Sequence, residues 1–194
     1  MTNTDTLPTL PFATPQDWET WLDAHHTTDT AGVWLKLAKA GAGVPSVMYA
    51  QALEVALCYG WIDGQKASFD EQYWLQKFTP RRPKSIWSQV NCAKATALIA
   101  AGRMREAGQR QVEAAKADGR WDAAYASQRT MDVPPDFQAE LDAHPAAQAF
   151  FAGLNSANRY AFLWRIHTAK KPETRAKRIA QFIEMLDRSE QLHP

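Results

Sequence analysis

The sequence predicts an α+β fold, with a small antiparallel sheet and helices in the N-terminal half and an all-helical C-terminal half. Three observations support this fold class. In "VWLKL", Val33, Leu35 and Leu37 alternate with other residues, which is typical of a strand with one buried face. After residue 85, apolar residues recur at helical spacing in several segments. Between these two parts, Pro80 and Pro83 interrupt regular structure.

The N-terminal elements follow from local signals. The first helix is expected in "TPQDWETWLDAHH", where Thr14 is the N-cap and Asp17 completes a capping box. A second helix is expected in "PSVMYAQALEVALCYG" and ends at Gly60. "WIDG" then predicts a short strand that enters a turn, because Asp-Gly is a common turn pair. "SFDEQYWLQKFTP" predicts one or two strands, with Trp74 and Phe78 on the same face.

From residue 85 onward, every expected element is a helix. "SIWSQVNCAKATALIAAG" predicts a helix that stops at Gly102, and "RMREAGQRQVEAAKADG" predicts another that ends at Gly119. Three short helices are expected in "VPPDFQAELDAHP", "PAAQAFFAGL" and "SANRYAFLWRIHTAK", and a last one in "KPETRAKRIAQFIEMLDRSE". The predicted organisation is a loosely packed N-terminus at residues 1–13, an α+β region at 14–84, and a helical region at 85–194 packed as one body.

The composition excludes several classes of protein. The chain has 194 residues, of which 45% are hydrophobic and 22% are charged, as in soluble globular proteins. A net charge of +1 gives no overall field that would attract nucleic acid or a membrane. No apolar run approaches the ~20 residues of a membrane span, and the N-terminus lacks the pattern of a signal peptide. We therefore expect a cytoplasmic protein in which the thiols of Cys58 and Cys92 are buried.

No metal, cofactor or catalytic constellation is predicted. The five histidines have no metal-ligand spacing, and no cluster of cysteine and histidine suggests a structural zinc. The sequence also lacks a P-loop, a dinucleotide-binding glycine motif and a nucleophile elbow. Cys58 would need a nearby base and a lowered pKa to act as a nucleophile, and such a thiol is more often part of the core. A non-enzymatic protein is favoured, with an enzyme centred on Asp63 or Cys58 as the alternative.

The strongest candidate for a binding site surrounds "FTPRRPKSIWSQVN". Its positive charges precede an expected helix start, where backbone N–H groups favour anions and arginine suits phosphate or carboxylate. Indole rings would form apolar walls, and the acid in "WIDG" would orient an arginine. This site would bind a small anionic ligand or a protein partner without a cofactor, and its expected lining residues are Trp61, Asp63, Arg81, Arg82, Ser85, Trp87 and Asn91. The alternative is a solvated loop whose arginines pair with Asp63 or Asp70.

A second hypothesis is a nucleic-acid-binding protein of the stress response, acting through two basic patches. The residues proposed for these patches are Arg81, Arg82, Lys84, Lys170, Lys171, Arg175 and Arg178. For the last helix the alternative is a solvated surface, balanced by Glu173 and Glu184. The near-neutral total charge argues against strong non-specific binding, because each neutralised phosphate requires a cation.

Five blocks of the sequence together resemble a known family. They are "ALCYGWIDG", "KFTPRRPKSIWSQVN", "GRM…AG…VEAAKADGRWDAAY", "VPPDF" and "AKKPETRAKRI", and they resemble the YdeI/OmpD-associated family, also called the bacteriocin-protection family. The resemblance runs from Trp18 to Leu186. It implies a role in bacterial resistance to antimicrobial peptides and related envelope stress, and an association with an outer-membrane porin. It implies neither a reaction nor a cofactor, so we expect a binding or interaction protein.

Overall fold

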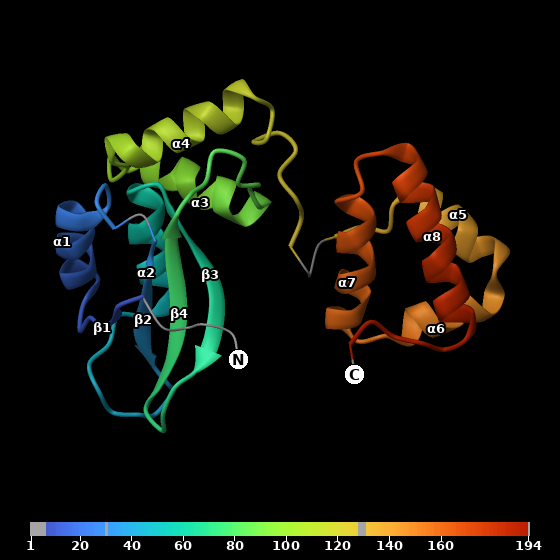
Figure 1. Cartoon of the computed structure of the whole chain (residues 1–194), viewed down its shortest axis with the longest axis horizontal. Helices are drawn as coiled ribbons and strands as arrows, with labels where there is room; N and C mark the ends of the chain where they lie inside the picture. Colours follow the sequence, from blue (N-terminus) through green and yellow to red (C-terminus); the bar gives the residue numbers. More distant parts are fainter. Residues whose placement is uncertain (1–6, 30, 128–130, 194) are drawn as a thin grey trace. The chain divides into compact units, whose positions relative to one another are not determined.

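The computed structural model describes residues 7–29, 31–127 and 131–193. The chain divides into two compact units, residues 1–124 and residues 125–194. The described residues form eight helices and four strands, and all four strands belong to the first unit (Figure 1). The predicted α+β class, with a helical C-terminal half, is therefore confirmed.

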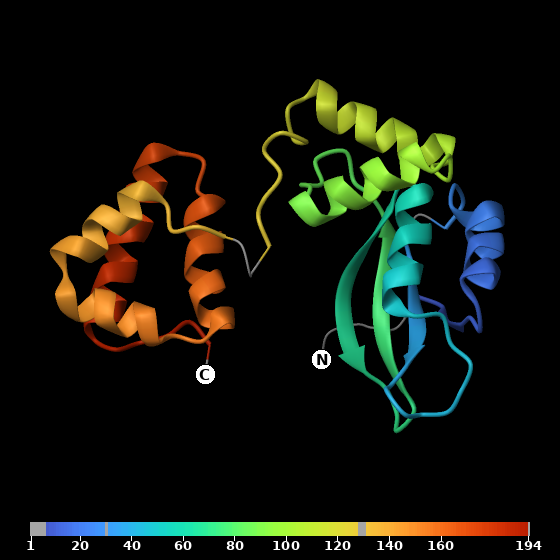
Figure 2. The same ribbon diagram turned by 180° about the vertical axis from the view of Figure 1, so that it is seen from behind.

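The N-terminal unit is a four-stranded sheet in the order β1-β2-β4-β3, with helices around it. Its strands are β1 (Thr9–Pro11), β2 (Val33–Ala38), β3 (Trp61–Ser68) and β4 (Tyr73–Pro80). Its helices are α1 (Pro15–His25), α2 (Tyr49–Cys58), α3 (Gln89–Ala100) and α4 (Glu106–Ala117). Helix α2 lies across one face of the sheet (Figure 2). This face of the sheet is its buried face, which carries Val33, Leu35 and Phe78.

The sheet is mixed, so the prediction of an antiparallel sheet is wrong for one strand. β1 runs parallel to β2, whereas β2 and β3 each run antiparallel to β4. Helix α1 connects β1 to β2, and such a crossover allows two consecutive strands to run in the same direction. β1 also occupies part of the N-terminus that was predicted to be loosely packed. Residues 1–6 of that prediction lie outside the described residues.

The boundary between the units lies after residue 124, and not between residues 84 and 85 as predicted. Helices α3 and α4 both pack against α2. Their buried residues Leu98 and Val112 belong to the same core as Leu57 of α2. The two helices therefore belong to the N-terminal unit, because they complete its core.

The stretch between α2 and β3 joins two buried elements. Tyr59 caps α2, and Gly60 follows with a φ of 73°, in the left-handed region that commonly ends a helix. Trp61, only 1% exposed, begins β3 beneath α1. Its ring meets those of Trp18 and Trp21 edge-on, and its indole N–H donates to the carbonyl of His26 at 3.3 Å. This anchor fixes the buried end of β3.

The C-terminal unit consists of four helices around its own core. They are α5 (Pro135–Ala143), α6 (Pro145–Gly153), α7 (Ser156–His167) and α8 (Pro172–Asp187). Phe151 meets Phe137 and Phe162 edge-on, and Phe162 meets Phe182 in the same way. Every helix in the described part of the chain is too short or too polar to cross a bilayer.

Candidate functional site

A hollow of about 350 Å³ lies where β3 ends and β4 begins, and it is the best candidate for a binding site in the N-terminal unit. Lys66, Ala67 and Ser68 of β3 and Trp74 of β4 line it. Tyr49, in the first turn of α2, stands beside it, with its ring centroid 6.1 Å from that of Trp74. The hollow therefore combines a cation, a hydroxyl and an aromatic wall, a mixture that is typical of small-molecule sites.

Asp63 and Lys66 lie on the same face of β3, although residues three apart in a regular strand lie on opposite faces. Asp63 is paired with Phe78, and Lys66 is paired with Gln76. β3 thus contains one residue more than β4 between these pairs, which is a β-bulge. Because Phe78 and Gln76 share the face that packs toward α2, the bulge brings the carboxylate and the ammonium group to that face together.

Gln76 holds the bulge in place. Its side chain is only 4% exposed, and its Nε2 donates to the carbonyls of Gly64 at 2.8 Å and of Gln65 at 3.2 Å. The extra residue of a bulge leaves backbone groups outside the regular ladder, and these groups are costly to bury without partners. Gln76 is therefore a positioning residue for Asp63 and Lys66.

Asp63 is half-buried and is oriented by Tyr49. The tyrosine hydroxyl donates to Oδ2 of Asp63 at 2.7 Å. In the described part of the chain, Oδ1 of Asp63 and the ammonium group of Lys66 have no hydrogen-bond or ion-pair partner. One carboxylate oxygen of Asp63 and the ammonium group of Lys66 thus remain available to a ligand, and Lys66 lines the hollow together with Trp74.

The seven residues predicted to line one anion site differ in their burial and in the residues that they contact. The rings of Trp61 and Trp87 lie in separate aromatic clusters, because Trp61 packs with Trp18 and Trp87 packs with Trp121. Trp87 is 2% exposed, and the guanidinium carbon of Arg81 lies 3.7 Å from its ring centroid. Both indoles thus contribute to the interior of the unit.

The arginine loop is held together by its own contacts. Arg81 is 6% exposed, and its Nη1 donates to the carbonyl of Ile86 at 3.2 Å. The backbone N–H of the exposed Arg82 donates to the hydroxyl oxygen of Ser85 at 3.2 Å, and the carbonyl of Ser85 accepts from Nη1 of Arg120 at 2.7 Å. Asn91 is half-buried in the first turn of α3. A single anion cleft lined by these residues stays a prediction.

The residues proposed for nucleic-acid binding also differ in setting. Lys84, Lys170 and Lys171 are exposed. Arg175 and Arg178 instead donate to the carbonyls of Ile166 and Arg165, in the last turn of α7. Cations at a helix C-terminus are stabilising, so two of the proposed contacts have a structural role. Nucleic-acid binding stays a prediction.

Cys58 is a poor candidate for a nucleophile. Its thiol is buried, and burial raises its pKa to about 11, while burial also raises the pKa of the half-buried Cys92. A thiol with a pKa near 11 is ~0.1% ionised at pH 8. We expect a thiol-specific disulfide reagent to label Cys92 in the folded protein and both cysteines in urea. Mass spectrometry counts the labelled cysteines. Rapid labelling of Cys58 in the folded protein would contradict this expectation and would support an enzyme centred on Cys58.

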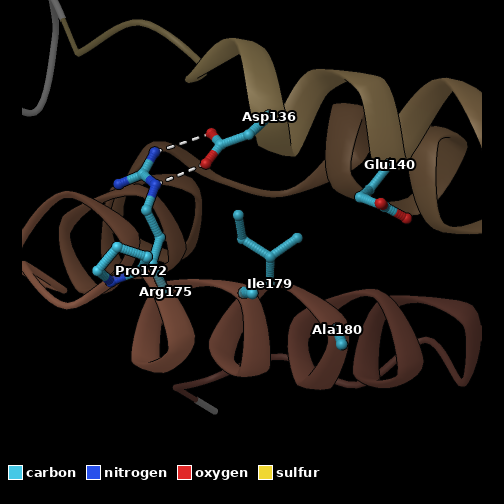
Figure 3. Close-up of a pocket in the computed structure, with 7 residues that line it drawn as sticks. Asp136, Glu140, Pro172, Arg175, Ile179 and Ala180 are labelled. Atoms are coloured by element: carbon cyan, nitrogen blue, oxygen red, sulfur yellow. Dashed lines mark hydrogen bonds and ion pairs between the residues drawn. The ribbon is translucent and has the colours of Figure 1, made fainter.

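The C-terminal unit has a groove of about 340 Å³ between α5 and α8. Figure 3 shows Ile179 of α8 pointing into the space between the helices, with Arg175 and Asp136 at one end. Nε and Nη2 of Arg175 donate to the two carboxylate oxygens of Asp136, at 2.6 and 2.8 Å. Because the third guanidinium nitrogen binds the carbonyl of Ile166 at 2.8 Å, this arginine joins three helices and is primarily structural.

The ion pair of Asp136 and Arg175 predicts an acid-sensitive C-terminal unit. Hydrogen bonds from Arg175 lower the pKa of Asp136 below its ordinary value of 3.8. The folded state then binds this proton less readily than the unfolded state, so the stabilisation is present above pH 3.8 and is lost as the pH falls through the lowered value.

Because Asp136 is largely exposed, we expect this loss to be about 1 kcal/mol. Urea unfolding at about pH 6 and about pH 3, followed by circular dichroism, measures it. Arg175→Met should remove this part of the pH dependence. Arg188→Met, which breaks the exposed pair with Glu190 at the C-terminal end of α8, is the matched control. An equal pH dependence in wild type and Arg175→Met would contradict the prediction.

Comparison with protein families assigns both parts of the chain. Residues 10–111, more than half of the sequence, match the family model described as Domain of unknown function (DUF8412). The chain belongs to the DUF8412 family. Residues 130–189 match the model "Bacteriocin-protection, YdeI or OmpD-Associated", which confirms the predicted family for this part. Searches of curated proteins and of solved structures each found no match.

The match to the bacteriocin-protection family covers a shorter part of the chain than the resemblance suggested. It covers α5–α8, whereas the DUF8412 match covers the sheet. Within the DUF8412 domain, Asp63 was among the predicted site residues, whereas Tyr49, Lys66, Ser68 and Gln76 were not. The available signal was "DGQK", where polar residues interrupt the alternation between "WI" and the next apolar residue. Such an interruption indicates either a turn or a bulge.

Proposed function

We propose that this protein is a non-enzymatic cytoplasmic binding protein that acts in bacteriocin protection. In this proposal the DUF8412 domain binds a small ligand in the hollow at the end of β3, and the C-terminal unit supplies the bacteriocin-protection domain. The family match of residues 130–189 supports the biological context. The raised pKa of Cys58 favours binding over nucleophilic catalysis at this cysteine.

The main observation in support of the ligand site is the bulge, which brings Asp63 and Lys66 to one face of β3, where Lys66 lines the hollow together with Trp74. In a regular strand, the neighbouring strand's backbone would supply these hydrogen bonds, and the amide of Gln76 would not be needed. The bulge is therefore less stable than a regular strand pairing. β-Bulges are over-represented beside functional sites, where they redirect side chains. Of the two residues redirected here, Lys66 lines a hollow large enough for a small molecule, and Asp63 is connected to this hollow through Tyr49, which packs against Trp74.

Native mass spectrometry of the freshly purified full chain tests this proposal. The wild-type protein should carry an added mass from a bound small molecule. Trp74→Ala removes the aromatic wall and should lose this mass. Trp164→Ala removes a half-buried indole of the C-terminal unit and should keep it. A wild-type protein without added mass, or a mass retained by Trp74→Ala, would contradict the proposal.

A further inference from the structure

We infer that the hollow binds a zwitterion of the amino-acid type that carries an aromatic or large apolar group. The ammonium group of the ligand would meet Asp63, its carboxylate would meet Lys66, and its apolar group would lie against Trp74. This inference rests on the proposed binding function and extends it by naming the class of ligand. The same chemistry is found in a free amino acid and in a short peptide.

The spacing of the two charged residues supports this class. Asp63 and Lys66 occupy successive positions on one face of β3, because the bulge accommodates one of the two residues between them. Such positions are about 7 Å apart along a strand. The lysine stem is flexible, so its ammonium group can approach a ligand held at Asp63. Two opposite charges at this separation match a molecule that carries its ammonium and carboxylate a few bonds apart.

Charge complementarity argues against ligands with one sign of charge. A simple anion at Lys66 would also lie near the carboxylate of Asp63, and a simple cation at Asp63 would lie near the ammonium group of Lys66. Like charges placed together lower affinity, so the pair selects ligands that carry both signs. In the described residues Asp63 and Lys66 form no ion pair with each other, so binding would not have to break one.

The aromatic side of the hollow favours an apolar group on the ligand. The rings of Tyr49 and Trp74 are tilted by 47° to each other, and the neighbouring Met48 is 63% exposed. Methionine and aromatic side chains adapt well to apolar ligands. A volume of about 350 Å³ lies at the small end of ligand sites, which suits an amino acid or a dipeptide.

Nuclear magnetic resonance titration of the ¹⁵N-labelled full chain tests the inference. The probes are L-phenylalanine, its N-acetyl derivative, its amide, and the dipeptide glycyl-L-phenylalanine. L-Phenylalanine or the dipeptide should shift the amides of residues 63–68 and Trp74. Each blocked derivative should bind about tenfold more weakly, because it loses one charge-assisted contact. Stronger binding of the dipeptide would assign the ligand to peptides, and stronger binding of phenylalanine would assign it to free amino acids.

Two variants assign the charges to their partners. Asp63→Asn should remove the preference for a free ammonium group, so that phenylalanine and its N-acetyl derivative bind equally. Lys66→Gln should remove the preference for a free carboxylate, so that phenylalanine and its amide bind equally. Lys84→Gln removes an exposed lysine outside the hollow and should keep both preferences.

The outcomes separate this inference from the proposed function. If all four probes bind equally and Trp74→Ala abolishes binding, the zwitterion inference is wrong and the ligand site stands. If no probe binds while wild type carries a mass that depends on Trp74, the inference alone is again wrong. If no probe binds and wild type carries no added mass, both are overturned.

Discussion

Replacing Gly108 with alanine is expected to lower the free energy of unfolding of the N-terminal unit by about 3 kcal/mol. Helix α4 crosses the end of α2 so closely that a Cβ at this position would lie 2.3 Å from the carbonyl oxygen of Cys58 and 2.6 Å from that of Leu57. Both are backbone atoms of a packed helix and cannot move without displacing it. Alanine normally stabilises a helix by about 1 kcal/mol relative to glycine. The clash outweighs this gain, so we expect Gly108→Ala to destabilise the unit.

Urea unfolding measures this effect, since seven of the eight tryptophans lie in the N-terminal unit and report its unfolding by fluorescence. Gly153→Ala in α6 is the matched control, because a Cβ there meets no atom within 4 Å. We expect Gly153→Ala to leave the free energy of unfolding unchanged or slightly higher, as measured by urea unfolding followed by circular dichroism. An unchanged stability of Gly108→Ala would show that α2 and α4 are less closely packed.

Replacing Gln76 with leucine is expected to destabilise the N-terminal unit by about 2 kcal/mol, because two bulge carbonyls lose their donor. Leucine has a similar volume, so the effect should come from hydrogen bonding and not from a cavity. Releasing the bulge should also disturb the alignment of Asp63 and Lys66. Binding in the hollow should weaken together with stability.

Gln109→Leu is the control for Gln76→Leu. It makes the same chemical change in the same unit, but Gln109 donates to Glu113 on the surface of α4, so its effect should stay below about 0.5 kcal/mol. Urea unfolding gives the energies, and amide chemical shifts of residues 63–68 report the bulge. Unchanged shifts in Gln76→Leu would show that this amide does not hold the bulge.

The helices could be predicted because their signals are local. Thr14 and Asp17 form the predicted capping box at the start of α1, with the backbone N–H of each residue donating to the side chain of the other. Gly60, Gly102 and Gly119 all have the positive φ that ends a helix. The alternation in β2 and the shared face of Trp74 and Phe78 likewise depend on neighbours in sequence.

The remaining features depend on partners that are distant in sequence. The parallel pairing of Thr9 with Trp34 requires the α1 crossover, which no short motif specifies. "DG" is compatible with a turn and with a bulge, and the choice here depends on Gln76 in the next strand. The position of Arg81 likewise depends on a partner, because its guanidinium group stacks on the ring of Trp87.

The alignment of β3 with β4 is the most direct test of the ligand site. In the ¹⁵N,¹³C-labelled full chain, cross-strand nuclear Overhauser effects should connect Lys66 with Gln76 and Asp63 with Phe78. A strand without the bulge would place Gln65 opposite Gln76 and would turn Lys66 to the other face of the sheet. Contacts between Gln65 and Gln76 in place of those from Lys66 would therefore contradict the proposed site.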